Sequence, residues 1–146
     1  MVQRRVRIYA DVENTPGIPP QILKQHVSQN IGTPSGSLAF LAERSRQIFE
    51  QKWRDAGFDI HVCEDGLDAA DRLLITTIIH DIQQDRENGH PSGTIVLVSG
   101  DGIYKDVLKV AQRLGWHIVI IWWKRKISEA LIDAAQDSID LATVME

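Results

Sequence analysis

The sequence predicts a three-layer α/β domain built on a mainly parallel sheet. Residues 94–98 and 118–123 are unbroken apolar or β-branched runs, as expected of strands that are buried on both faces. Between them, apolar residues within 107–114 recur at helical spacing, and Gly115 ends the pattern. A strand, a helix and a second strand in this order form a βαβ unit, in which the two strands are parallel.

The length and composition suit one domain spanning residues 1–146. The net charge of −4 argues only weakly against a nucleic-acid partner, because carboxylates gathered at one site would lower the total. Cys63 is the single cysteine, which excludes an internal disulfide and a cysteine metal cluster and suggests the reducing cytoplasm. No apolar run approaches the roughly 20 residues of a membrane helix, so we expect no membrane association.

The other elements follow from periodicity and turn residues. Before the βαβ unit we expect a strand at 6–12, a helix from Pro20 to about Ser28, a mobile surface loop at 30–37, an amphipathic helix at 38–53 that stops before Gly57, a strand at 58–63 and a helix from about Asp68 to Arg86. After the unit we expect a short helix capped by Ser128 and reaching about Gln136, then an edge strand at 139–142.

Three carboxylates are predicted to meet at one edge of the sheet. Asp11 ends the first strand, Asp101 follows strand 94–98, and Asp71 lies in the first turn of the helix between them. Parallel strands place their carboxyl ends along the same edge. Crowded carboxylates repel one another unless a cation neutralises them, and oxygen ligands with open water positions suit Mg²⁺ or Mn²⁺. Such a site would hydrolyse phosphodiester bonds. Helix capping is the competing interpretation of Asp101 and Asp71 when each is taken alone.

Three segments match one protein family in order and spacing: YADVENTP, AADRLLITTIIHDI and TIVLVSGDGIYKDVLKVAQRLGWHIVII. Together they resemble the NYN domain family of PIN-like ribonucleases over nearly the whole chain. The resemblance implies a Rossmann-like, PIN-like three-layer α/β/α fold and a Mg²⁺- or Mn²⁺-dependent ribonuclease acting on single-stranded RNA. It also implies that Asp11, Asp71 and Asp101 bind metal and that Asn14 orients a ligand or water.

The chain departs from the family pattern at two positions. The family often has a second acid where this chain has Ile103, and another on the following turns of the helix where it has Thr77. Asp68, which also suits a helix cap, could compensate as a ligand. The full set of auxiliary candidates is Asp68, Ser99, Glu13 and Asp106.

A basic run at 124–126 follows strand 118–123, on the same edge as the acids. We expect Lys124 and Arg125 to contact RNA phosphates there. A second basic group lies at the opposite edge and is interpreted as solvated surface: Arg4, Arg5 and Arg7.

The sequence can also be compared with other classes of protein. A catalytically degenerate RNA-binding or interaction module would keep the fold and lose the chemistry, and either form is compatible with a homo-oligomer. A phosphorylated receiver-like domain fits poorly, because it needs a carboxylate pair at the end of the first strand and a phosphoacceptor flanked differently from Asp101. Residues 11–14 also lack the DxD arrangement of haloacid-dehalogenase-like phosphatases.

Overall fold

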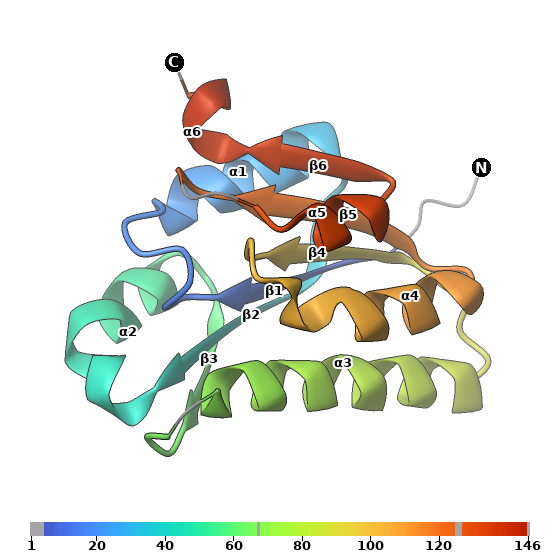
Figure 1. Cartoon of the computed structure of the whole chain (residues 1–146), viewed down its shortest axis with the longest axis horizontal. Helices are drawn as coiled ribbons and strands as arrows, with labels where there is room; N and C mark the ends of the chain where they lie inside the picture. The colour runs from blue at the N-terminus through green and yellow to red at the C-terminus, as the bar shows by residue number, and fades with distance from the viewer. Residues whose placement is uncertain (1–4, 67, 125–126, 146) are drawn as a thin grey trace.

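The computed structural model describes residues 5–66, 68–124 and 127–145. At its centre is a six-stranded sheet in the order β3-β2-β1-β4-β5-β6, with every neighbouring pair parallel (Figure 1). The strands are β1 (Val6–Asp11), β2 (Pro34–Ala42), β3 (Asp59–Cys63), β4 (Thr94–Val98), β5 (His117–Trp122) and β6 (Asp137–Asp140). The helices are α1 (Pro20–Asn30), α2 (Arg46–Asp55), α3 (Ala69–Glu87), α4 (Lys105–Arg113), α5 (Glu129–Asp133) and α6 (Leu141–Val144), with 3₁₀ turns η1 (Glu43–Ser45) and η2 (Gly102–Tyr104).

The strand order reverses between β1 and β4. From β1 the chain builds outward through β2 to β3, returns to place β4 on the other side of β1, and builds outward again through β5 to β6. The loops that leave β1 and β4 therefore diverge to opposite sides, which opens a crevice beyond the carboxyl ends of these two strands. In sheets of this kind ligands bind at that switch point, and the topology places the residues after Asp11 and Val98 there.

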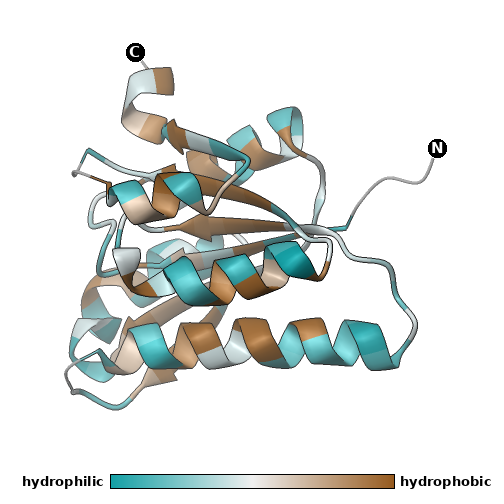
Figure 2. Ribbon diagram, turned by 45° about the vertical axis from the view of Figure 1, so that its right-hand side comes forward, coloured by the Kyte–Doolittle hydropathy of each residue, from teal (hydrophilic) through white to brown (hydrophobic). Residues whose placement is uncertain are grey.

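Two apolar cores cover the two faces of the sheet, which confirms the predicted three-layer α/β/α arrangement. On one face Leu23 and Val27 of α1 and Trp53 of α2 pack against the strands. On the other face α3 and α4 pack against the strands through residues such as Leu74 and Leu108. Figure 2 shows the consequence in hydropathy, with apolar strands inside and helices that alternate between apolar and polar surfaces. Within the described residues, no helix combines the length and the apolar character needed to cross a bilayer.

Two helices end at glycine as the sequence predicts. Gly115 has a φ of 92°, and the N–H of Trp116 donates to the carbonyl of Ala111 at 3.0 Å. Gly57 has a φ of 86°, and the N–H of Phe58 donates to the carbonyl of Trp53 at 3.1 Å. Glycine adopts this left-handed conformation without the steric cost of a Cβ atom, so each helix stops and the following strand begins at once.

The prediction for residues 34–45 is wrong. Residues 34–37 of the expected loop and residues 38–42 of the expected helix form β2, η1 follows, and α2 begins only at Arg46. A short apolar run does not distinguish a buried strand from a helix by periodicity alone. Here strand pairing decides, because β2 lies between β1 and β3 and bonds to both. Ile48, which lies within the amphipathic helix predicted at 38–53, is 72% exposed.

Smaller corrections concern helix starts and the last strand. Asp68 lies at the N-cap position of α3 but adopts a left-handed conformation (φ 58°) and makes no side-chain capping bond. Ser128 also makes no capping bond, and α5 ends at Asp133 instead of Gln136. The edge strand predicted at 139–142 is observed two residues earlier, as β6, because Leu141 begins α6.

Alternate residues of β1 meet acidic residues of α3. Arg7, Tyr9 and Asp11 share one face of the strand because side chains alternate along it. The guanidinium of Arg7 donates to both carboxylate oxygens of Asp85, and the hydroxyl of Tyr9 donates to Asp81 Oδ2 at 2.7 Å. The third position, Asp11, is an acid itself and faces the start of α3.

The prediction that the arginines at the amino edge are solvated surface is wrong for Arg7. Its side chain is only 18% exposed, and its partner Asp85 is buried. Arg5 Nη2 lies 2.7 Å from Asp85 Oδ1, so this buried carboxylate has two cationic partners. Arg4 lies outside the described residues.

Candidate active site

Asp11 and Asp71 are brought together by Tyr104. Asp11 is the last residue of β1 and is 3% exposed. Asp71 lies in the first turn of α3. The hydroxyl of Tyr104, in η2, is 2.8 Å from Asp11 Oδ2 and 3.1 Å from Asp71 Oδ1. A phenol has one proton to donate, so this hydroxyl bonds to one carboxylate at a time and lies between the two.

A second set of bonds joins Asp11 to the loop after β4. Ser99 is fully buried, and its hydroxyl lies 3.1 Å from Asn14 Oδ1 and 3.4 Å from Asp11 Oδ2. The N–H of Gly100 donates to Asn14 Oδ1 at 2.9 Å, and the N–H of Asp101 donates to Ser99 Oγ at 3.2 Å. The loop that carries Asp101 is therefore fixed to the end of β1 by Asn14 and Ser99.

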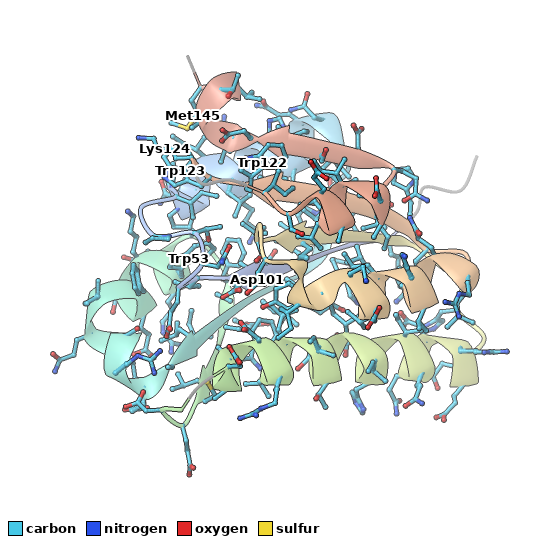
Figure 3. The ribbon with its side chains drawn as sticks, in the orientation of Figure 1. Trp53, Asp101, Trp122, Trp123, Lys124 and Met145 are labelled. Carbon is cyan, nitrogen blue, oxygen red and sulfur yellow. The ribbon has the colours of Figure 1, made fainter. Side chains whose placement is uncertain are left out.

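Asp101 lies beyond β4 in an extended conformation. Its Oδ1 accepts a hydrogen bond from the N–H of Ile103 at 3.1 Å, which caps η2. Figure 3 shows Asp101 near the carboxyl ends of the central strands. The capping interpretation is thus correct for one oxygen of Asp101, while the same side chain also lines the adjacent pocket.

The acidic pocket, as we name it, is a cavity of about 250 Å³ at the switch point of the sheet. Five of its lining residues are acids: Asp11, Glu13, Asp68, Asp71 and Asp101. Its other lining residues are Asn14, Ala42, Arg44, Gly66, Ala69 and Ala70. A second cavity of about 620 Å³, lined by residues of the η2 and α5 region, shares Asn14 and Asp101 with it. The two cavities therefore meet at these two side chains.

The electrostatics of the pocket favour an added cation. The pKa of Asp11 is raised to about 7: burial is the largest cause, the charges of Asp71 and Asp101 add to it, and the hydrogen bond from Tyr104 acts against it. Burial also raises the pKa of Asp71, as do the charges of Asp101 and Asp68. Burial and the two neighbouring carboxylates raise the pKa of Tyr104 far above its ordinary value. Tyr104 therefore stays protonated and acts as a donor.

Asp11 and Asp85 are the two buried aspartates among the described residues, and their surroundings differ. Burial raises the pKa of Asp85, but hydrogen bonds from Arg7 and Arg5 outweigh it, so the net pKa is lowered. Asp11 has no Lys, Arg or His within ion-pair distance in the part of the chain that the structure describes. A buried carboxylate without such a partner is costly unless it is protonated or binds a cation.

The donor set of the acidic pocket fits a divalent ion of the Mg²⁺ type. Such an ion binds through one or two carboxylates and keeps several waters, and Asp11 and Asp71 already share one hydroxyl between them. Within residues 5–66, 68–124 and 127–145, no three Asp, Glu, His or Cys side chains are grouped closely enough to hold an ion together. The fit is therefore to a site with two carboxylates and much water. A third direct ligand from Asp101 or Asp68 would require those side chains to move.

Lys124, the described residue of the basic run after β5, does not line this pocket. Lys124 is exposed, and its Nζ lies 5.1 Å from the centre of the Trp123 ring. In Figure 3 Lys124 and Trp123 lie together, away from Asp101. Neither cavity that meets at Asp101 is lined by Lys124. Arg125, the other predicted RNA contact, and Lys126 lie outside the described residues.

Two site residues were not predicted from the sequence. Tyr104 follows the apolar residue Ile103 and leads into α4. A tyrosine in this position is normally interpreted as part of the hydrophobic core. Arg44 lies within the helix predicted at 38–53, whereas the structure places it in η1. The signal that could have identified Tyr104 is its spacing from Asp101, since a 3₁₀ turn returns its side chain toward the end of β1.

The fold and the pocket define a class: a parallel α/β domain with clustered carboxylates at the switch point of its sheet. The sequence profile described as NYN domain matches residues 5–142, so this chain belongs to the NYN domain family, a nuclease-like family related to PIN domains. The predicted family membership is confirmed.

The fold is also found in a solved structure. A crystal structure of VPA0982, a protein of unknown function from Vibrio parahaemolyticus RIMD 2210633, superposes with a TM-score of 0.69 at 19% sequence identity. The match covers 94% of this chain and 92% of the Vibrio chain. At this identity the likeness concerns the fold alone. No protein of curated function matches the sequence.

Proposed function

We propose that the chain is a divalent-metal-dependent ribonuclease that hydrolyses phosphodiester bonds of single-stranded RNA at the acidic pocket. The observation that carries the proposal is the contrast between the two buried aspartates. Asp85 is neutralised by Arg7 and Arg5, whereas Asp11 faces Asp71 and has only a hydroxyl between them. Membership of a nuclease-like family supports a metal-dependent hydrolase as the use of such a site.

In this proposal Asp11 and Asp71 hold the ion, and Asp101 is the third carboxylate of the site. A bound Mg²⁺ or Mn²⁺ would supply charge stabilisation at the phosphate and lower the pKa of the attacking water. Asn14 uses its Oδ1 to fix the Gly100 loop, which leaves its amide nitrogen to orient a water or a phosphate oxygen. Tyr104 keeps Asp11 and Asp71 correctly placed, and the buried Ser99 supports the loop of Asp101.

We also propose that the protein acts in the reducing cytoplasm, and its single cysteine is the residue that bears on this. Cys63 is a free thiol whose Sγ lies 3.5 Å from the carbonyl oxygen of Leu41. Burial raises the pKa of this thiol, which keeps it protonated. A reducing cytoplasm is compatible with this residue.

The test is cleavage of a labelled single-stranded RNA in Mn²⁺, Mg²⁺ or EDTA. We expect wild-type chain to cleave only with a divalent ion, and Asp101→Asn to lose cleavage. Asp106→Asn is the matched control, because Asp106 is exposed in the first turn of α4 and does not line the acidic pocket. Equal loss in both variants would argue against a site at Asp101.

One observation favours a second function. Ile103 occupies a position where the family often has an acid, and no preformed group of three ligands exists among the described residues. A catalytically degenerate RNA-binding or interaction module would have these features. Binding of RNA by wild-type protein without cleavage in any divalent ion, and without a thermal shift in Mn²⁺, would select this function over the ribonuclease.

A further inference from the structure

Arg44 is the single cationic side chain among the described residues that line the acidic pocket. It belongs to η1, which follows β2, and its side chain is 54% exposed. The other charged lining residues are all carboxylates. Among the described lining side chains, Arg44 is therefore the one whose charge would attract a phosphodiester.

The guanidinium of Arg44 is held in place by acids from two different segments. Its Nη2 donates to Glu13 Oε2 at 2.9 Å, and its Nη1 lies 3.5 Å from Asp65 Oδ1. The backbone N–H of Arg44 also donates to Asp65 Oδ1, at 2.8 Å. Glu13 follows β1 and Asp65 follows β3, so the position of Arg44 depends on the carboxyl ends of two strands of the sheet.

Glu13 supports Arg44 with its carboxylate. Its Oε1 accepts a hydrogen bond from the N–H of Ala42 at 2.8 Å, and its Oε2 accepts one from Arg44. Both oxygens are engaged. The sequence-based suggestion that Glu13 compensates for missing acids is therefore not favoured by these contacts.

The contacts of Arg44 differ from those of the other arginines nearby. Arg46 and Arg54 pair with Glu50 one helical turn away along α2, on the exposed surface. Such pairs contribute little and are common on helices. Arg44 instead bonds to residues distant in sequence, at the rim of a cavity, and its two side-chain contacts use only part of the N–H donors of a guanidinium.

We infer that Arg44 binds a phosphate of the RNA strand beside the bond that is cleaved, and that Glu13 and Asp65 position it. This inference rests on the proposed ribonuclease function. A planar guanidinium can bind two phosphate oxygens at once, which fixes the orientation of the strand as well as its charge. Arg44 would thus align the RNA with Asp11 and Asp71, which line the same pocket.

The test measures binding separately from cleavage. The affinity of a labelled single-stranded RNA is measured by fluorescence anisotropy in EDTA, at several salt concentrations, with Arg44→Ala, Arg44→Lys and, as matched control, Arg54→Ala. We expect Arg44→Ala to weaken binding about tenfold and to reduce the salt slope by about one phosphate contact. Arg44→Lys should keep the salt slope but recover only part of the affinity, and Arg54→Ala should match wild type.

A structural role for Arg44 predicts a different result. Arg44→Ala would then lower the melting temperature and leave the affinity and the salt slope of the folded protein unchanged, which would overturn the inference. Arg44→Gln gives a second variant if Arg44→Ala does not fold, because it keeps most of the side chain, removes the charge and should also weaken RNA binding. If wild-type chain binds RNA but never cleaves it, the ribonuclease is wrong, and a binding loss in Arg44→Ala would still support the phosphate contact.

Discussion

The hydroxyl of Tyr104 lies 2.8 Å from Asp11 Oδ2, deep in the core and between two carboxylates. In a chain without a bound ion, this hydroxyl is the donor that reduces the cost of burying Asp11 beside Asp71. A hydrogen bond to a charged group contributes about 1.5–3 kcal/mol. Removal of this hydroxyl should therefore change the stability of the metal-free protein more than that of the metal-bound protein.

We predict that Tyr104→Phe destabilises the protein by about 1–3 kcal/mol in EDTA and by much less in Mn²⁺, because a bound cation would then neutralise Asp11 and Asp71 directly. Thermal denaturation with and without Mn²⁺ measures this. Tyr9→Phe is the matched control, since Tyr9 is also buried and donates to an acid of α3, Asp81, outside the pocket. Its loss should be the same with and without Mn²⁺, and equal behaviour of the two variants would contradict the prediction.

The raised pKa of Asp11 predicts how stability depends on pH. Burial raises this pKa from 3.8 to about 7. The folded state therefore binds the proton more tightly than the unfolded state, and the stabilisation is fully present below about pH 4 and lost as the pH rises to about 7. Each pKa unit corresponds to about 1.4 kcal/mol, so we expect the melting temperature in EDTA to fall through this window.

Two comparisons isolate Asp11 in that experiment. Asp11→Asn should flatten the fall between pH 4 and pH 7, and Mn²⁺ should oppose it in the wild type. Asp85 has the opposite effect on stability, because its pKa is lowered in the folded state. Its ionised form stabilises the fold above about pH 4, and this stabilisation is lost only as the pH falls below about 4. A wild-type curve that is flat from pH 4 to pH 7 in EDTA would show that Asp11 is not buried as an unpaired acid.

The predictions from sequence were accurate where local signals and the fold agree. The segment from β4 to β5 consists of an apolar run, an amphipathic helix, Gly115 and a second apolar run. The ends of the helix and the strands therefore follow from local sequence signals. The placement of Asp11 and Asp101 followed from parallel strands sharing one edge. The error at residues 34–45 arose because β2 owes its conformation to pairing with β1 and β3, which no local pattern records.

The same error removed Arg44 from the predicted site. An arginine on the polar face of a helix looks like solvated surface, whereas η1 turns Arg44 toward Glu13 and Asp65. Tyr104 was missed for a related reason, since its hydroxyl reaches Asp11 only because η2 brings it back to β1. Contacts between segments distant in sequence explain both omissions.

The predicted role of the basic run remains testable. We predict that Lys124→Ala combined with Arg125→Ala weakens RNA binding and lowers its salt dependence without changing the melting temperature. The control is Lys52→Ala combined with Arg54→Ala on α2, which removes the same charge away from the edge. The Nζ of Lys124 lies over the ring of Trp123. An equal effect of the two double variants on RNA binding would show that Lys124 is ordinary surface.

The last prediction restores the acid that the family often has and this chain lacks. Ile103 is 41% exposed and follows Asp101 by two residues, so an aspartate there avoids the penalty of a buried charge. We expect Ile103→Asp to bind Mn²⁺ more tightly and to show a larger rise in melting temperature with Mn²⁺, because stabilisation by a ligand of the folded state grows as its dissociation constant falls. Ile48→Asp on α2, at an exposed isoleucine outside the acidic pocket, is the matched control and should leave the Mn²⁺ shift unchanged. If Ile103→Asp gains both the shift and RNA cleavage that wild type lacks, the chain has the fold of a nuclease and lacks one ligand. If wild type already has both, Asp11, Asp71 and Asp101 suffice.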